Sequence, residues 1–191
     1  MQKVVITGHD LTVDQIIAVC REGAEVVLSD ESREKILASR QVVNELVEER
    51  KVVYGITTGF GKFSDVVISQ DECKLLQKNL IITHAVGAGD PFKEDIARGI
   101  LLLRVNSLSN GFSGICLETV ETMIAMLNKG VTPFIPEKGS LGASGDLAPL
   151  SHMVLPMIGL GMAWYKGELL TGAEAMERAG IPVIELSAKE G

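Results

Sequence analysis

Two glycine-rich segments hold the residue types best suited to chemistry. The first, at 139–152, reads G-S-L-G-A-S-G-D-L-A-P-L-S-H and stands before an apolar stretch with helical spacing. A glycine-rich loop before a helix can bind phosphate through backbone N–H groups and the helix dipole. However, no basic residue follows the glycines, so the phosphate-loop and dinucleotide patterns both fail. Ser144 could act as a nucleophile, but its G-A-S-G setting departs from the G-x-S-x-G elbow. Spacing alone leaves a phosphate-binding loop and a chemically reactive loop both open.

The second segment, at 54–61, reads Y-G-I-T-T-G-F-G, a composition that predicts an irregular loop. A single tyrosine at such a place usually packs at the end of a strand. His84 ends an apolar helical stretch and precedes small residues, so its ring could either be a satisfied core group or face a cavity. His9 and His152 have no partners at a spacing suited to zinc ligands, so no metal site is predicted.

The 139–152 segment resembles the signature of the aromatic amino acid ammonia-lyases. In that family an Ala-Ser-Gly tripeptide cyclises with loss of two waters to 4-methylideneimidazole-5-one (MIO), and the resemblance gives this role to Ala143, Ser144 and Gly145. The residue types suit the reaction: a glycine amide can approach the preceding carbonyl closely, a small alanine does not block it, and the serine hydroxyl can be eliminated. Asp146 follows directly, where it could cap the next helix or assist cyclisation, and we favour the cap.

The same resemblance gives roles to the second segment and to His84. Tyr54 takes the place of the general base that removes the β-carbon proton of the substrate, and Gly61 belongs to its loop. A phenol is a poor base at neutral pH without a nearby cation or oriented dipoles, and the sequence shows no such partner near Tyr54. His84 takes the position that selects the substrate side chain. Histidine there suits a histidine or tyrosine substrate, because an apolar ring would leave the imidazole unpaired.

The resemblance therefore implies an amino acid substrate and an MIO group, without metal or nucleotide. With histidine as the substrate, the product would be trans-urocanate. A tyrosine ammonia-lyase or an aminomutase is the alternative in the same class, and a non-catalytic scaffold or interaction module is the alternative in another. Members of the family are much longer, so we expect the chain to be the N-terminal part of a lyase, inactive alone and homotetrameric in its full-length parent.

Composition limits the other possibilities. The 191 residues are 46% hydrophobic and 23% charged, which is typical of a globular protein in solution. With 25 acidic and 18 basic residues the net charge is −7, which disfavours nucleic acid and anionic membranes as partners. Three separated cysteines and the absence of a leader-like N-terminus favour the cytoplasm. No apolar run reaches the roughly 18 residues of a membrane span.

The elements that position these segments follow from apolar periodicity and capping patterns. The predicted strands lie at 3–6 and 26–28, and a helix opens at Thr12, where T-V-D-Q offers a capping hydroxyl with a glutamine three residues on. Further helices are predicted at 30–50, 69–85, 93–108, 113–128 and 147–160, and a hairpin at 163–171. We expect Pro149 to be tolerated in a first helical turn, and Pro156 either to kink the helix or to mark a break in it. Arg104 and Asn106 are expected to hold neighbouring loops. The fold class is mainly α with a small mixed β portion, as in the N-terminal part of the ammonia-lyase bundle, divided into parts at 1–65 and 66–191.

Overall fold

The structure is a computed structural model that describes residues 2–49, 51–58, 70–141, 143 and 145–191. The helices are α1 (Val13–Arg21), α2 (Asp30–Glu48), α3 (Gln70–His84), α4 (Glu94–Leu108), α5 (Leu117–Lys129), α6 (Leu147–Val154) and α7 (Gly172–Arg178). The strands are β1 (Lys3–Ile6), β2 (Glu25–Leu28), β3 (Ala88–Pro91), β4 (Val131–Pro133), β5 (Pro136–Lys138), β6 (Met162–Tyr165) and β7 (Glu168–Thr171). The predicted class, mainly α with a small mixed β portion, is confirmed.

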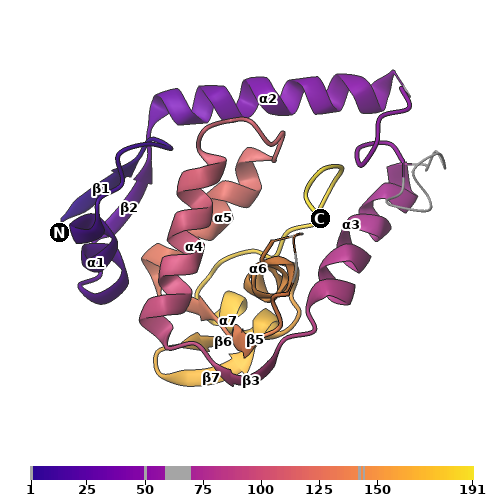
Figure 1. Cartoon of the computed structure of the whole chain (residues 1–191). Coiled ribbons are helices and arrows are strands. Elements are labelled where there is room, and N and C mark those ends of the chain that lie inside the picture. Colours follow the sequence, from indigo (N-terminus) through magenta and orange to yellow (C-terminus); the bar gives the residue numbers. More distant parts are fainter. Residues whose placement is uncertain (1, 50, 59–69, 142, 144) are drawn as a thin grey trace.

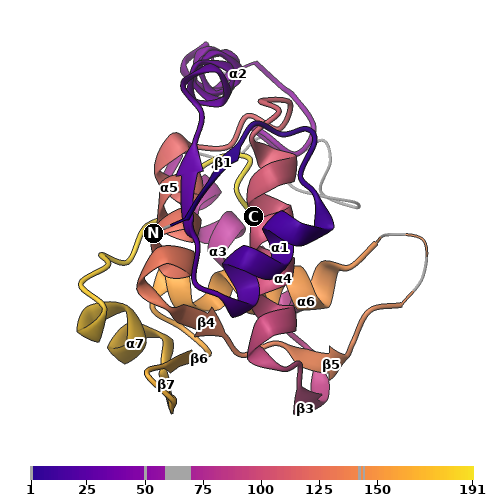
Figure 2. The ribbon, with the colours of Figure 1, turned by 90° about the vertical axis from the view of Figure 1, so that its left-hand side faces the viewer.

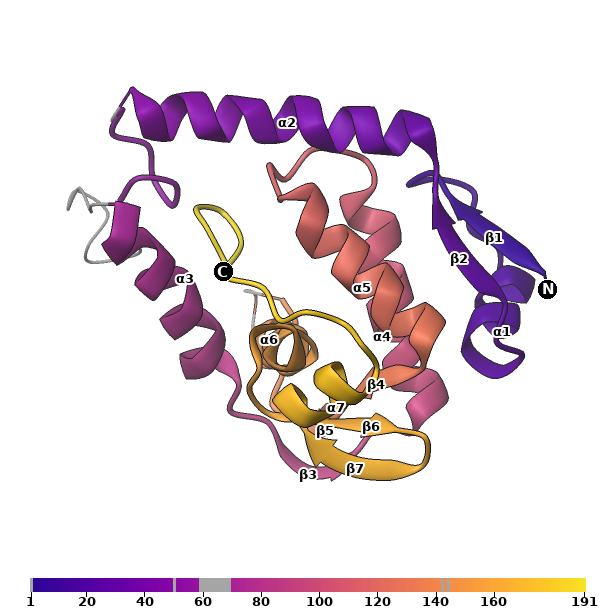
Figure 3. The same ribbon diagram turned by 180° about the vertical axis from the view of Figure 1, so that it is seen from behind.

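Helix α2 runs along one edge of the molecule and joins two parts of it (Figure 1). At its start lie α1 and the parallel pair β1–β2, and from its far end the chain turns into α3. Helix α5 packs against α2, and α4 packs against α5; both lie below α2 in the view along its axis (Figure 2). The antiparallel sheet β4–β6–β7 and α7 close the opposite edge, and the last segment of the chain returns between α3 and α5 (Figure 3).

The core is built from aliphatic side chains of α4 and α5, together with the β1–β2 pair. Leu101, Leu102 and Val105 of α4 and Val120 and Met126 of α5 are fully buried. These two helices therefore lie at the centre of the described fold. Burying side chains from several faces of a helix is the chief stabilising contribution in such a core, at roughly 1.5–3 kcal/mol per large aliphatic residue.

Local sequence signals explain where several elements begin and end. Helix α1 starts with the predicted capping box, in which the Thr12 hydroxyl accepts the Gln15 N–H at 3.3 Å and Gln15 accepts the Thr12 N–H at 2.9 Å. Pro149 lies in the first turn of α6. The helix ends at Val154, and a 3₁₀ turn that contains Pro156 follows, as predicted.

The start of α5 corrects the predicted helix at 113–128. The helix begins at Leu117, four residues later, because Gly114 takes a positive φ of 71° and its N–H donates to the Ser39 hydroxyl at 3.0 Å. Strands β3, β4 and β5 were not predicted, since three or four residues of mixed polarity carry too little periodicity. Helix α7, with seven residues, was not predicted either. The predicted division after residue 65 falls outside the described residues.

The expectation that Arg104 and Asn106 hold loops is not met within the described ranges. The Asn106 Oδ1 atom is buried without a hydrogen-bond partner, and burial lowers the pKa of Arg104. The neighbouring Arg98 of the same helix instead connects helices. Arg98 donates to the carbonyls of Val19 and Leu127 at 2.9 and 3.1 Å, which ties α4 to α1 and α5.

Candidate active site

The Ala-Ser-Gly segment lies between β5 and α6 in the chain. The Ser140 hydroxyl lies 2.7 Å from the Asp146 carboxylate and 3.4 Å from the Gly145 carbonyl, so it closes the loop across its base. Gly145 has a φ of +88°, and no atom lies within 4 Å of the place its Cβ would take. Ala143 and Gly145 are exposed, and Ser144 lies outside the described residues. A small residue and a glycine in a conformation that other residues rarely adopt fit the cyclisation that forms MIO.

Asp146 stands at the N-terminal capping position of α6, but its side chain does not cap the helix. The predicted cap is wrong for a local reason. The backbone of Asp146 has φ −90° and ψ 55°, outside the extended conformation from which a capping side chain reaches the next turn. Its carboxylate instead accepts the hydrogen bond from Ser140. Asp146 therefore fixes the loop rather than the helix.

His84 is the last residue of α3 and is half-buried. Its Nδ1 atom lies 2.7 Å from the Leu80 carbonyl oxygen and 3.4 Å from the Thr83 hydroxyl. Because a carbonyl oxygen can only accept, this contact requires the proton on Nδ1. Nε2 of the neutral ring is then an acceptor, which is the group needed to recognise an N–H or O–H on a substrate ring.

Tyr54 lies in a turn after α2, and 60% of its surface is exposed. Threonine hydroxyls shape this turn: Thr57 accepts the Val53 N–H at 2.9 Å and donates to the Lys51 carbonyl. The turn also meets the start of α3, where the Cys73 thiol lies 3.6 Å from the carbonyl of the turn residue Ile56. Gly61, the other residue predicted for this loop, lies outside the described residues.

The contacts of α3 set the relative places of these groups. The turn of Tyr54 packs near Cys73 in the first part of α3, whereas His84 ends the helix, about 16 Å further along at about 1.5 Å per residue. The segment after His84 reaches the base of the Ala-Ser-Gly loop, because the Gly87 N–H donates to Nε2 of His152 in α6 at 3.0 Å. The structure thus joins the His84 segment to the base of the loop and places the Tyr54 turn at the opposite end of α3 (Figure 1).

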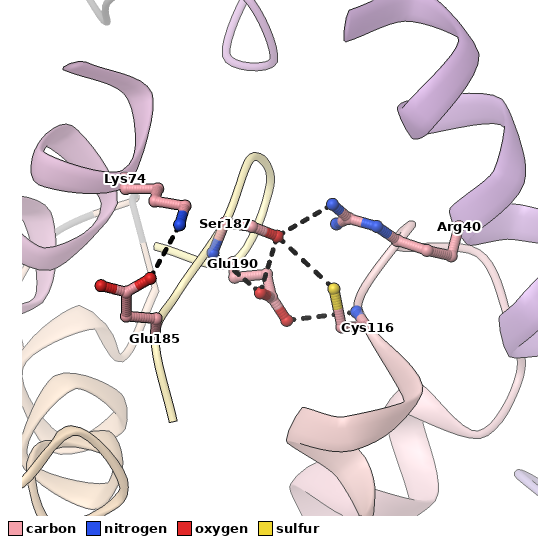
Figure 4. A network of polar contacts seen from close by, with 6 residues as sticks. All are labelled: Arg40, Lys74, Cys116, Glu185, Ser187 and Glu190. Atoms are coloured by element: carbon pink, nitrogen blue, oxygen red, sulfur yellow. Dashed lines mark hydrogen bonds and ion pairs between the residues drawn. The ribbon is translucent and has the colours of Figure 1, made fainter. Parts of the chain in front are cut away.

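A buried carboxylate network near the last described residue was missed by the sequence reasoning (Figure 4). Glu190 is 9% exposed and accepts hydrogen bonds from the Cys116 N–H at 3.1 Å, from the Ser187 N–H and hydroxyl at 2.9 and 3.0 Å, and from the Thr119 hydroxyl. Arg40 of α2 donates to the Ser187 hydroxyl at 2.8 Å. Burial is the main cause that raises the pKa of the Cys116 thiol. One glutamate between lysine and glycine carries no periodic signal, so the sequence alone does not reveal this network.

The sequence of the chain matches a known family of proteins. Residues 11–191 match the family model described as aromatic amino acid lyase. The chain belongs to this family. It is 62% identical over 191 residues to the histidine ammonia-lyase of Caldanaerobacter subterraneus subsp. tengcongensis, and 58% identical to that of Clostridium tetani. Both matches cover all of this chain but only 38% and 37% of the relatives. This chain therefore spans less than two-fifths of their length.

Solved structures of the family share the fold. An ergothionase from Treponema denticola, in complex with desmethyl-ergothioneine sulfonic acid, superposes with a TM-score of 0.94 at 32% identity, over 100% of this chain and 38% of its own. The histidine ammonia-lyase from Trypanosoma cruzi gives 0.92 at 39% identity, over 99% and 37%. A tyrosine aminomutase from Streptomyces globisporus gives 0.89 at 36% identity, over 98% and 35%.

The described ranges contain neither a candidate metal centre nor a candidate membrane span. Within them, no group of three or more His, Cys, Asp or Glu side chains is placed to hold a metal ion. No helix in the same ranges has the length and apolar character to span a membrane.

Proposed function

We propose that this chain works as the N-terminal part of a histidine ammonia-lyase, which eliminates ammonia from L-histidine without oxidation to give trans-urocanate. The observation that carries the proposal is the identity of 56–62% to proteins named histidine ammonia-lyase, extending over 97–100% of the chain. Identity to the tyrosine aminomutases is 36%. This difference favours histidine over tyrosine as the substrate.

In this proposal Ala143, Ser144 and Gly145 form the MIO group. The Gly145 nitrogen attacks the Ala143 carbonyl carbon, two waters are lost, and the oxygen of one of them comes from the Ser144 hydroxyl. The group supplies an electrophilic methylene, which makes the amino group of the substrate a better leaving group. The hydrogen bonds from Ser140 to Gly145 and Asp146 support the role, because they hold together the two ends of the loop that contains the tripeptide.

Tyr54 and His84 act on the substrate in this proposal. Tyr54 takes the β-proton, and its side chain lies at the surface, where 60% of the residue is exposed. His84 holds the substrate ring: its Nδ1 is committed to the Leu80 carbonyl, so Nε2 accepts the imidazole N–H of histidine. A phenylalanine ring offers no donor and would leave Nε2 unpaired.

The assembly we propose is a cytoplasmic homotetramer of the full-length enzyme. Large apolar side chains are exposed on α3 and α4, where Leu75 is 58%, Ile82 42% and Leu103 51% exposed. Such faces are expected to be covered by other parts of a larger assembly. On its own, the 191-residue chain is expected to have little or no lyase activity.

The first test is the intact mass of the purified chain. Cyclisation lowers the mass by two water molecules, and the Ser144→Ala variant is the control, since it lacks the hydroxyl that must be eliminated. Full sequence mass in the wild type, together with oligomers or aggregates in light scattering, would favour a non-catalytic interaction module instead.

The second test is a graft. This chain replaces the matching segment of the Caldanaerobacter relative, and urocanate formation is followed by its ultraviolet absorbance. We expect the graft to act on L-histidine and not on L-phenylalanine. In the graft, Ser144→Ala should abolish activity, and Tyr54→Phe should lower kcat about 10²–10⁴-fold, as for loss of a general base. A folded, cyclised graft that acts on L-tyrosine rather than L-histidine would overturn the assignment of the substrate.

A further inference from the structure

Three segments meet at one glycine, Gly87, three residues after His84. Strand β5 enters the Ala-Ser-Gly loop there: a Cβ on Gly139 would lie 2.9 Å from the Gly87 Cα and 3.1 Å from the Cβ of Ala148 in α6. A Cβ on Gly87 would in turn lie 3.0 Å from both the His152 Nε2 and the Pro136 Cβ. The His84 segment, the start of the loop and the helix after the loop are therefore in close backbone contact.

One hydrogen bond fixes this meeting point. The Gly87 N–H donates to Nε2 of His152 over 3.0 Å. An imidazole nitrogen accepts only when it carries no proton, so the ring must be neutral with its proton on Nδ1. Burial lowers the pKa of His152, which keeps the ring in this neutral form near neutral pH. The side chain comes from the second turn of α6, the helix that directly follows Asp146.

We propose that His152 is a positioning residue that holds the segment carrying His84 against α6 through its hydrogen bond to Gly87. The consequence for catalysis rests on the proposed function, in which His84 binds the substrate ring. His84 ends its helix, and its own ring contact reaches back to Leu80 within that helix. The bond to His152 ties the backbone beyond His84 to α6, so it fixes the direction in which the helix end points.

The first experiment measures amide hydrogen exchange in the 191-residue chain by NMR. His152→Leu removes the acceptor at similar volume, and the Gly87 amide should exchange about tenfold faster, as for loss of one net hydrogen bond. His152→Gln keeps an acceptor oxygen at a similar reach and should restore most of the protection. The Phe92 amide, which donates to the Ile135 carbonyl at 2.9 Å in the neighbouring strand pair, is the internal control and should not change.

A second variant separates the hydrogen bond from loss of folding. Gly87→Ala leaves His152 intact but inserts a Cβ 3.0 Å from Nε2, so it should also speed exchange at residue 87 while the Phe92 amide stays protected. Unchanged exchange at residue 87 in both His152→Leu and Gly87→Ala would overturn the proposed hydrogen bond. Equal acceleration at Gly87 and Phe92 would overturn it too, because the effect would then be general loosening.

The second experiment uses the graft with the Caldanaerobacter relative. His152→Leu should raise the KM for L-histidine about tenfold with a smaller change in kcat, and His152→Gln should return the KM toward the wild-type value. A tenfold loss in kcat with no change in KM would refute the positioning role, although the hydrogen bond itself could still be present. An inactive wild-type graft would count against the proposed function, and the exchange measurements would still decide the contact.

Discussion

Removal of the Glu190 carboxylate is expected to destabilise the fold strongly, although the residue lies outside the candidate active site. In Glu190→Ala, the backbone N–H groups of Cys116 and Ser187 lose their acceptor, and the hydroxyls of Thr119 and Ser187 lose theirs. A buried donor left unpaired costs about 1–3 kcal/mol, and the hydroxyls can rotate toward other partners. Two backbone groups therefore give a loss of about 3 kcal/mol in the free energy of unfolding, a large part of the roughly 5–15 kcal/mol of a typical domain.

The measurement is urea unfolding followed by circular dichroism and by the fluorescence of Trp164, the single tryptophan. Glu185→Ala is the matched control. Glu185 is a glutamate of the same segment and is paired to Lys74 at 2.7 Å, but its side chain is 79% exposed (Figure 4). Exposed ion pairs contribute little, so this variant should unfold with the wild type. Glu190→Gln, which keeps one acceptor oxygen, should fall between the wild type and Glu190→Ala.

The reasoning would be refuted if Glu190→Ala and Glu185→Ala unfolded at the same urea concentration with the same slope. That result would mean that water or rearranged hydroxyls replace the carboxylate at no net cost. Amide exchange at Cys116 and Ser187 gives an independent reading, since both N–H groups should lose protection in Glu190→Ala and keep it in Glu185→Ala.

Three further predictions concern single contacts of the fold. Gly114→Ala should destabilise the fold by about 2 kcal/mol or more, because its Cβ would lie 2.4 Å from Val43 Cγ2. Gly130→Ala is also at positive φ but has open space around it, so it should cost only about 1 kcal/mol. Thermal unfolding of both variants measures the difference. Asn128→Ala should cost about 2 kcal/mol in urea unfolding, since the Asn128 amide bonds both the N–H and the carbonyl of a β2 residue at 2.8 and 2.9 Å. Burial lowers the pKa of His152 in the folded chain, so below pH ~6.5 the unfolded chain binds more protons than the folded one. The free energy of unfolding should therefore fall as the pH drops from about 6.5 toward the lowered pKa. In unfolding measured between about pH 7.5 and 5, His152→Leu should weaken this dependence on pH.

Sequence reasoning succeeded where a residue's effect is local. The Thr12 capping box and the break at Pro156 depend on neighbours within one or two turns, and both are present as predicted. It failed where a distant residue decides. Gly114 delays the start of α5 because Ser39, 75 positions away, accepts its N–H. Glu190 is buried against donors that lie 71 and 74 residues earlier in the chain, and no pattern in the neighbouring sequence predicts these contacts.

The candidate site divides in the same way. The resemblance to the family pointed to the tripeptide at 143–145, but it could not give the contacts around it. Asp146 was expected to cap α6, and its backbone angles direct the carboxylate to Ser140 instead. The link from Gly87 to His152 was equally hidden, because two residues 65 positions apart meet only when α3 and α6 pack.

The placement of Tyr54 also leads to a prediction about assembly. The Tyr54 turn contacts Cys73 in the first part of α3, whereas the base of the Ala-Ser-Gly loop is tied to the segment after the last residue of α3 through the bond from Gly87 to His152. A general base must come within hydrogen-bond reach of the substrate, so base and electrophile of one site are expected to come from different copies of the chain.

Co-expression of Tyr54→Phe and Ser144→Ala copies of the graft tests this expectation. Each variant alone should be nearly inactive. In a random equal mixture, a site that draws the two groups from different copies is intact in about one case in four, so about a quarter of wild-type activity should return. If both groups came from the same copy, every site would keep one defect and no activity would return. Recovery on mixing would therefore show that catalysis requires oligomerisation, and its absence would require the Tyr54 turn to close over the loop of its own chain.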